Sequence, residues 1–220
     1  MASGRELPGW PVRVTADAKH EKLGSAFNIS GPYLVVTLGS YFAEPRYQGR
    51  VLTIDRASGR VVHVFNSLCS DLQDQIFHPS ACLFSNSGIW SRAGAVIFPG
   101  NKRILVGTGN GPFNGTTNWA DSVLMLAPDA SRLLQNWTPA EQADLEARDK
   151  DIGSTSPALL PLPGRGKAQY RYAAQGSKDF KVRLLSLDRL NGVSKTPGPQ
   201  TGGELQSFGG AWVYLSLIHI

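Results

Sequence analysis

The stretch Val106–Gly115, VGTGNGPFNG, places four glycines and two asparagines directly after the apolar run RIL. Such a loop could cradle a phosphate, form a hairpin turn, or end a strand beside a ligand. A phosphate cradle requires G-x-G-x-x-G between a strand and a helix, or G-x-x-x-x-G-K-S/T, and the stretch matches neither. Its sequence therefore excludes a phosphate loop of either kind and favours a turn or a ligand-facing strand end.

Other signatures of catalytic or metal chemistry are absent from the sequence. The four histidines, His20, His63, His78 and His219, never approach one another at metal-ligand spacing, and no paired-cysteine zinc signature occurs. Neither a G-x-S-x-G nucleophile elbow nor a haem-attaching C-x-x-C-H motif appears. These observations disfavour a zinc site, a hydrolase of that kind and a haem domain in this chain.

The composition is that of a folded, loop-rich globular protein, with 24 glycines, 14 prolines and 41% hydrophobic residues among 220. The net charge is +5, but the basic residues are scattered and are not interleaved with aromatics, which disfavours nucleic-acid binding. No apolar stretch approaches the roughly 18 residues of a membrane span, and MASGRELPGWPV lacks the layout of a signal peptide. We expect either a cytosolic protein or a missing native N-terminus.

Two cysteines, Cys69 and Cys82, lie in one irregular stretch, SLCSDLQDQIFHPSACLFS. A disulfide there would brace a loop whose apolar periodicity is too poor to brace it otherwise. Such a bridge would favour an oxidising compartment, the periplasm or the extracellular space. The alternative is a pair of unbonded thiols.

Short β-rich runs bounded by turn residues recur along the chain and predict an all-β protein. The clearest hairpin runs from Gly49 to Asn66, with strands at 51–54 and 61–65. In its turn, Asp55 can accept hydrogen bonds from the backbone and Gly59 can adopt a positive φ. Similar strand-turn-strand units are predicted around Pro99–Lys102, over 122–137 and over 156–192.

These units repeat at long intervals, with Val51, Val123 and Val182 opening equivalent strands 72 and then 59 residues apart. Antiparallel units of about four strands are typical of β-propeller blades. We predict three to four blades, hence an incomplete propeller whose remaining blades are absent from this chain. The blades should occupy residues 24–205, after an N-terminal extension or partial blade at 1–23 and before a non-native-looking or truncated tail at 206–220.

One helix interrupts this pattern. Thr138 is the predicted N-cap, Pro139 the first helical residue, and Glu141 the partner of a capping box. The helix should span Ala140 to Arg148 on the surface.

The hairpins TIDRASGRVVHVF and SLDRLNG, with IWSRAGAVIFPGNKRILVGTGNG, resemble the blades of pyrroloquinoline quinone (PQQ) β-propeller repeat proteins. Within that family the likeness is to quinoprotein alcohol dehydrogenases, over roughly residues 24 to 205. The family also includes non-catalytic propellers similar to an outer-membrane assembly lipoprotein. The resemblance therefore implies either a dehydrogenase or a scaffold for protein–protein interaction.

The dehydrogenase pattern implies five site residues, which are Glu44, Trp90, Asn110, Asp151 and Lys178. Glu44, Asn110 and Asp151 correspond to calcium ligands, and Trp90 to the indole on which PQQ stacks. Asp151 corresponds to the catalytic base that takes the alcohol proton, and Lys178 to the cation that contacts the quinone oxygens. The substrate would be an alcohol or a sugar, and a separate electron acceptor would be needed.

Each of these residues has a simpler explanation when it is taken alone. Glu44 and Asp151 are also consistent with solvated loop carboxylates, Asn110 with a turn former, and Lys178 with a surface charge. Trp90 is also consistent with a core or inter-blade residue. The two interpretations differ in one geometric expectation, because an enzyme must bring these side chains to one point and a scaffold need not.

Overall fold

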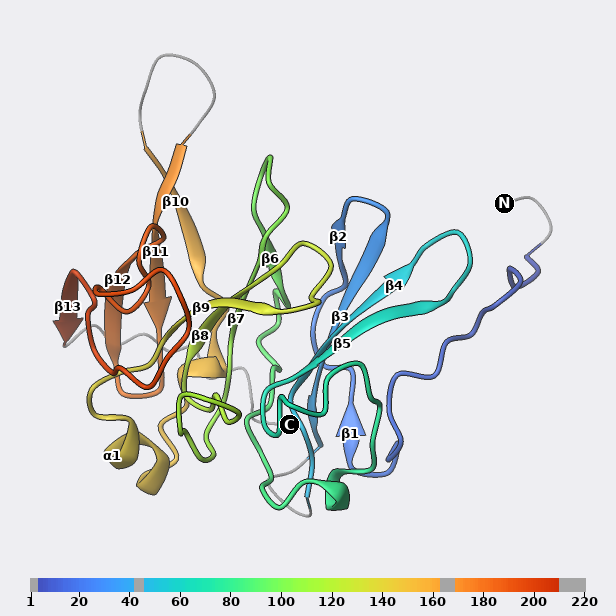
Figure 1. The fold of residues 1–220 in the computed structure, drawn as a ribbon, viewed down its shortest axis with the longest axis horizontal. Helices are drawn as coiled ribbons and strands as arrows, with labels where there is room; N and C mark the ends of the chain where they lie inside the picture. The colour runs from blue at the N-terminus through green and yellow to red at the C-terminus, as the bar shows by residue number, and fades with distance from the viewer. Residues whose placement is uncertain (1–3, 42–45, 163–168, 210–220) are drawn as a thin grey trace.

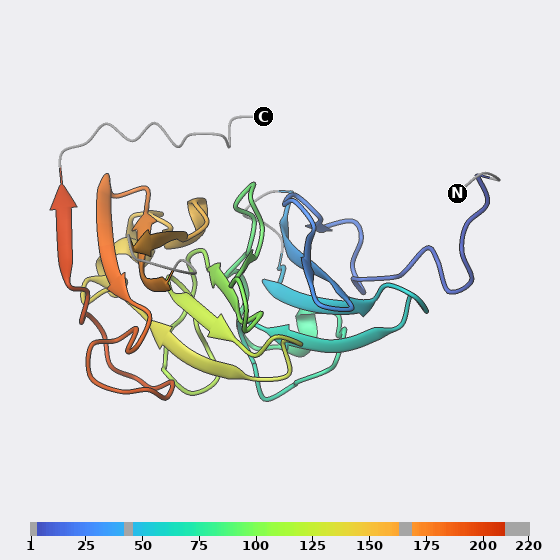
Figure 2. The ribbon, with the colours of Figure 1, turned by 90° about the horizontal axis from the view of Figure 1, so that it is seen from above.

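Three antiparallel sheets lie side by side in chain order in the computed structural model, which describes residues 4–41, 46–162 and 169–209 (Figure 1). The prediction of an all-β fold built from four-stranded units is confirmed. Figure 2 shows the first and third sheets at opposite ends of the molecule, with the second between them. The three sheets do not close into a ring, as expected of an incomplete propeller.

The first sheet has the order β1-β3-β4-β5, and β2 also pairs with β3. Because β1 pairs with the end of β3 and β2 with its beginning, the two short strands share one strand position. The strands of this sheet are β1 (Glu21–Lys22), β2 (Asn28–Ser30), β3 (Tyr33–Ser40), β4 (Arg50–Asp55) and β5 (Val61–Asn66).

The second and third sheets have simple up-and-down order, β6-β7-β8-β9 and β10-β11-β12-β13. The strands of the second are β6 (Val96–Ile97), β7 (Ile104–Gly107), β8 (Val123–Leu126) and β9 (Leu133–Trp137). Those of the third are β10 (Ala158–Leu162), β11 (Gln169–Gly176), β12 (Lys181–Ser186) and β13 (Gln206–Gly209). Strand β13, which pairs with β12, lies in the range 206–220 that the sequence analysis assigned to a tail.

The predicted repeat corresponds to the sheets, because Val51, Val123 and Val182 lie in β4, β8 and β12, the third strand position of each sheet. The hairpin turn of the first sheet also forms as predicted. The Ser58 N–H donates to Asp55 Oδ1 at 2.9 Å, and Gly59 has φ +68°. Turn chemistry therefore sets the register of β4 against β5.

Alternation along the strands gives the middle sheet two buried faces. Ile104 packs toward the first sheet, with Val51, while Leu105 packs toward the third, with Leu185. Successive side chains on a strand point to opposite faces, so one apolar strand can serve both interfaces. The outer face of the first sheet is covered by an N-terminal segment, where Trp10 packs on a cluster that includes Leu52.

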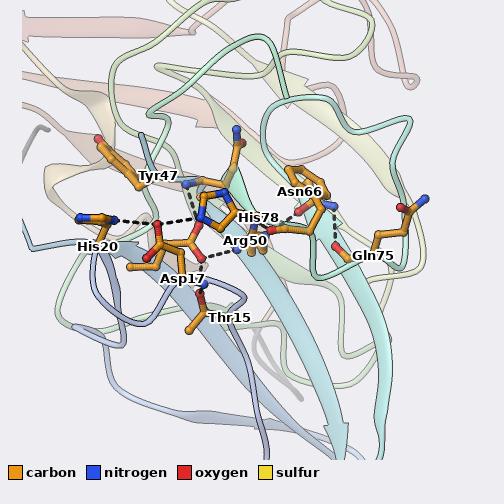
Figure 3. Close-up of polar contacts among 12 residues, drawn as sticks. Thr15, Asp17, His20, Tyr47, Arg50, Asn66, Gln75 and His78 are labelled. Atoms are coloured by element: carbon orange, nitrogen blue, oxygen red, sulfur yellow. Dashed lines mark hydrogen bonds and ion pairs between the residues drawn. The ribbon is translucent and has the colours of Figure 1, made fainter. Parts of the chain in front are cut away.

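A buried ion pair joins β4 to β1 within the first sheet, and its arginine also contacts the cysteine loop (Figure 3). Arg50 Nη1 lies 2.6 Å from Glu21 Oε2, and both side chains are fully buried. The guanidinium also donates to Asn66 Oδ1 at 2.9 Å and to the carbonyl of Phe77 at 2.7 Å. The network therefore connects β1, β4 and β5 to the loop before η1 (Pro79–Ala81).

A disulfide joins Cys69 and Cys82, with an S–S distance of 2.01 Å, so the bridged alternative is the one that the structure has. Cys82 is buried with Leu68 and Ala120. The bridge closes the loop that supplies the Phe77 carbonyl to Arg50.

Removing this bridge with Cys69→Ser/Cys82→Ser is expected to lower the free energy of unfolding by about 3 kcal/mol, because the open chain gains loop entropy when it unfolds. The bridged residues are 13 apart in sequence. Urea denaturation measures the loss, and reduction of the wild-type protein should reproduce it. Equal urea midpoints for the variant and the oxidised wild type would contradict the expectation.

The helix forms later than predicted, as α1 (Gln142–Ala147), and the predicted capping box is wrong. The Thr138 hydroxyl is buried and lies 2.7 Å from Ser122 Oγ, so it does not cap the helix. The Glu141 carboxylate instead accepts hydrogen bonds from Lys181 at 2.8 Å and Arg183 at 2.7 Å. Tertiary partners in the second and third sheets outcompete the local cap. No helix in the described ranges is long and apolar enough to cross a membrane.

Candidate functional site

Two kinds of segment carry the predicted site residues. Asn110 and Lys178 follow the second strands of their sheets, β7 and β11, while Trp90 and Asp151 precede the first strands, β6 and β10. Glu44 follows β3 in sequence but lies outside the described residues. In an antiparallel sheet these exits and entries share one end, so the four described residues lie at corresponding ends of their sheets.

Asp151 contacts two of the other described residues, Lys178 and Asn110. Its side chain is 1% exposed, its Oδ2 lies 2.5 Å from Lys178 Nζ, and its Oδ1 accepts from the Asn110 backbone N–H at 2.8 Å. Asp151 immediately precedes the short turn η2 (Ile152–Ser154), whose Gly153 leaves no room for a side chain. A Cβ at Gly153 would lie 2.5 Å from the Thr108 carbonyl carbon. This close approach of two backbones places Asp151 against the loop after β7.

The charges of this group are coupled. Burial raises the pKa of Asp151 above its ordinary value, against the opposing effect of Lys178. Burial alone would lower the pKa of Lys178, but the charges and hydrogen bonds of Asp151 and Asp149 raise it. The ammonium therefore keeps its proton, and Asp151 is a buried carboxylate with increased basicity.

The Asn110 side chain turns its amide nitrogen toward Asp149, donating to Oδ1 at 2.7 Å. That orientation leaves the side-chain Oδ1 of Asn110 without a hydrogen-bond donor among the described residues, whereas its backbone carbonyl accepts from the Ser87 N–H at 2.6 Å. An amide carbonyl oxygen next to carboxylates is a donor type that Ca²⁺ accepts.

The Trp90 indole rests on glycine backbones. A Cβ at Gly39 would lie 2.9 Å from the indole, one at Gly88 2.3 Å, and one at Gly109 2.7 Å. Backbone hydrogen bonds hold this surface together, since Gly109 N donates to the Gly88 carbonyl at 2.8 Å. The Tyr47 ring lies 5.8 Å from the indole, centroid to centroid, and Trp90 Nε1 is buried without a hydrogen-bond partner in the described part of the chain.

Gly109 also brings the indole and the carboxylate together. A Cβ at this position would meet both the Trp90 ring and Asp151 Oδ1, the latter at 3.3 Å. The glycine-rich stretch that opened the sequence analysis is thus a strand end, and its backbone crowds the indole and Asp151. Of the five predicted residues, the structure brings Trp90, Asn110, Asp151 and Lys178 together.

The sequence analysis did not identify two further carboxylates beside Asp151. Asp121 is fully buried, and its Oδ1 accepts from the Ile152 N–H at 3.3 Å. Burial and the charge of Asp151 raise the pKa of Asp121 to about 8. Glu146, on α1, accepts from the Gly111 N–H, and burial with Asp151 and Asp149 raises its pKa. No motif marks either residue, because their relevance comes only from burial beside Asp151.

Asp121 should make the free energy of unfolding depend on pH. The folded protein keeps this carboxyl protonated up to about pH 8, whereas the unfolded chain releases the proton near the ordinary pKa of 3.8. Stability due to the retained proton is therefore lost as pH rises between these values, by at most about 1.4 kcal/mol per pH unit.

In Asp121→Asn the side chain is neutral at every pH. The variant should therefore lack this part of the pH dependence of the free energy of unfolding, and it should be more stable relative to wild type at pH 8 than at pH 5. Urea midpoints measured from about pH 5 to pH 8 test the difference. Asp144→Asn is the matched control, because Asp144 is an exposed carboxylate that lies 2.7 Å from Arg148 Nε. Parallel curves for wild type and Asp121→Asn would contradict the expectation.

Within the described part of the chain, no three His, Cys, Asp or Glu side chains are grouped so that they could hold a metal ion. The predicted calcium ligands are a different set of residues, since they include the amide of Asn110 and Glu44, which lies outside the described residues. Burial is the main cause of the raised pKa values of Asp121, Glu146 and Asp151, and the charge of Asp151 adds to it at the other two. A divalent cation bound beside these carboxyl groups would favour their ionised forms.

No protein family matches the sequence, and no curated protein matches it. Among solved structures, the chain is similar to a europium-containing methanol dehydrogenase, with a TM-score of 0.60 and 14% identity over 86% of this chain and 34% of that chain. It also matches BamB from Moraxella catarrhalis with a TM-score of 0.41 and 12% identity, over 84% of this chain and 37% of that one. The chain thus spans about a third of the length of these structures. The first likeness supports the fold, an incomplete β-propeller of four-stranded blades.

Proposed function

We propose that this chain carries part of the active site of a dehydrogenase that oxidises an alcohol or a sugar with PQQ and calcium. One observation supports the proposal above others, namely the buried Asp151 carboxylate held between Lys178 and Asn110 beside the Trp90 indole. A solvated loop carboxylate would have neither the burial nor the paired cation. A buried base with a raised pKa and a specific charged partner is a feature of catalytic sites.

The residues that would hold the two groups follow from donor type. Asp151, the side-chain Oδ1 of Asn110 and Glu44 would hold calcium, which prefers oxygen ligands, and the Trp90 indole would support the flat PQQ ring. When bound, calcium and PQQ would supply a Lewis acid and a hydride acceptor.

The chain's own residues would supply the proton chemistry and the positioning. Asp151 would take the hydroxyl proton of the substrate, helped by the burial that raises its pKa. The Asn110 N–H fixes one oxygen of that carboxylate, so the other is the one aimed toward Lys178. The Lys178 ammonium would stabilise negative charge that develops nearby, and the packed indole would exclude water from one side.

Thermal melting with added CaCl₂ and PQQ tests the proposal. Ligand that binds the folded state at about a hundred times its Kd should stabilise it by about 2.7 kcal/mol and so raise the Tm. Asp151→Asn should reduce this shift, while Asp144→Asn should retain it. An unchanged Tm in the wild-type protein would instead favour the alternative function, a non-catalytic propeller that binds other proteins.

We further propose a periplasmic or extracellular location, supported by the Cys69–Cys82 disulfide, because disulfides persist in oxidising compartments. Thiol labelling of protein taken directly from its cells should modify neither cysteine. Labelling of both would contradict this location.

A further inference from the structure

A second site lies at the opposite ends of the strands that carry the candidate site. An open pocket of about 440 Å³ is formed by residues of the second sheet and its turns, among them Arg103 and Gln135, and by the segment after β12, which includes Lys195. Arg103 precedes β7, whose other end leads to Asn110. The pocket is thus separated from Asp151 by the length of the strands.

Three cations line this pocket without a carboxylate partner. Arg103, Arg132 and Lys195 form no ion pair with any residue that the structure describes. The Arg103 guanidinium donates to the neutral Met125 Sδ at 3.7 Å. Unpaired cations that converge on one concavity attract an anion, because low-dielectric walls focus their field.

The acidic residue of the pocket does not neutralise them. Asp188 Oδ2 accepts from Arg171 Nη2 at 2.9 Å, so its charge is already matched by a fourth cation. Gln135, which is 6% exposed, supplies a neutral donor to the pocket lining, because its Oε1 accepts from the Leu190 N–H at 2.9 Å. Its amide NH₂ is the end left for a ligand.

We propose that this pocket binds a small phosphate-type anion, either free phosphate or the phosphoryl group of a small ester. Two guanidinium groups and an ammonium suit a doubly charged oxyanion, since guanidinium forms paired hydrogen bonds with phosphate oxygens. The volume exceeds what one phosphate ion fills, and Leu133, Leu134 and Leu187 give it apolar walls against which the organic part of an ester could pack. The site does not depend on the dehydrogenase proposal.

Titration of the ¹⁵N-labelled chain tests the inference, with inorganic phosphate in one series and glycerol 3-phosphate in another, both at constant ionic strength. Saturable shifts are expected in the amides of Leu134, Gln135 and Thr196. Tighter binding of phosphate identifies the free anion as the ligand, and tighter binding of glycerol 3-phosphate identifies an ester.

Arg103→Gln/Arg132→Gln should weaken binding at least about tenfold, because each charge-assisted hydrogen bond to an oxyanion is stronger than a neutral one. Arg60 is an exposed arginine in the turn between β4 and β5, so Arg60→Gln removes one charge elsewhere and should leave binding unchanged. Lys195→Gln, in an exposed loop, serves as a second variant if the double variant unfolds. Non-saturable shifts, shifts spread over the charged surface, or equal weakening by Arg60→Gln would overturn the inference.

Discussion

Asp151→Asn is expected to lower the rate of dye-linked alcohol oxidation by about a hundredfold to ten-thousandfold, the range that general-base catalysis contributes. Asparagine has the same shape and can still accept the hydrogen bond from the Asn110 N–H. It cannot take a proton, and it no longer attracts Lys178, whose Nζ lies 2.5 Å from Asp151 Oδ2. The loss should therefore appear mainly in kcat.

The assay requires calcium, PQQ and the longer protein that the sequence analysis predicts, because the chain spans about a third of the dehydrogenase that it resembles in fold. Asp144→Asn, on the exposed face of α1, is the matched control and should oxidise alcohol at the wild-type rate. Retention of most activity by a folded Asp151→Asn variant would eliminate Asp151 as the base.

Glu21→Leu is expected to lower the free energy of unfolding by about 3 to 5 kcal/mol, the cost of leaving one partner of a buried ion pair uncompensated. The Arg50 guanidinium has no exposure to water, and burial lowers its pKa while Glu21 opposes that shift. Leucine would also leave the Gln48 N–H without its acceptor, which is Glu21 Oε1 at 3.0 Å.

Urea denaturation measures this loss. Glu21→Leu/Arg50→Met should be more stable than Glu21→Leu alone, because it removes the orphaned charge together with its partner. A loss below about 1 kcal/mol in the single variant would mean that water or another group already compensates Arg50.

Local chemistry was sufficient to predict much of the fold. Asp55 and Gly59 determine a turn through interactions within a few residues, so the hairpin could be recognised without knowledge of its neighbours. Thr138 and Glu141 show the limit of that reasoning. Both have the right residue types for a cap, but Ser122 and Arg183, which are distant in sequence, bind them instead.

The candidate site likewise contains residues that the sequence could suggest and one, Asp121, that it could not. Asn110, Asp151, Lys178 and Trp90 could be proposed because the resemblance to quinoprotein dehydrogenases implies a role for each of them. Asp121 could not, since a carboxylate in WADSV has no local sign that it will be fully buried beside Asp151. Burial is a property of the packed sheets and therefore cannot be read from a short stretch of sequence.

The surface beneath the Trp90 indole consists of main chain contributed by two sheets and the segment between them. Its shape therefore depends on the spacing of those sheets, and side-chain substitutions elsewhere cannot change it in small steps. Even one added methyl group at Gly88 or Gly109 would displace the ring. Under the proposed function, room for molecules of different size must then come from the other side of the indole.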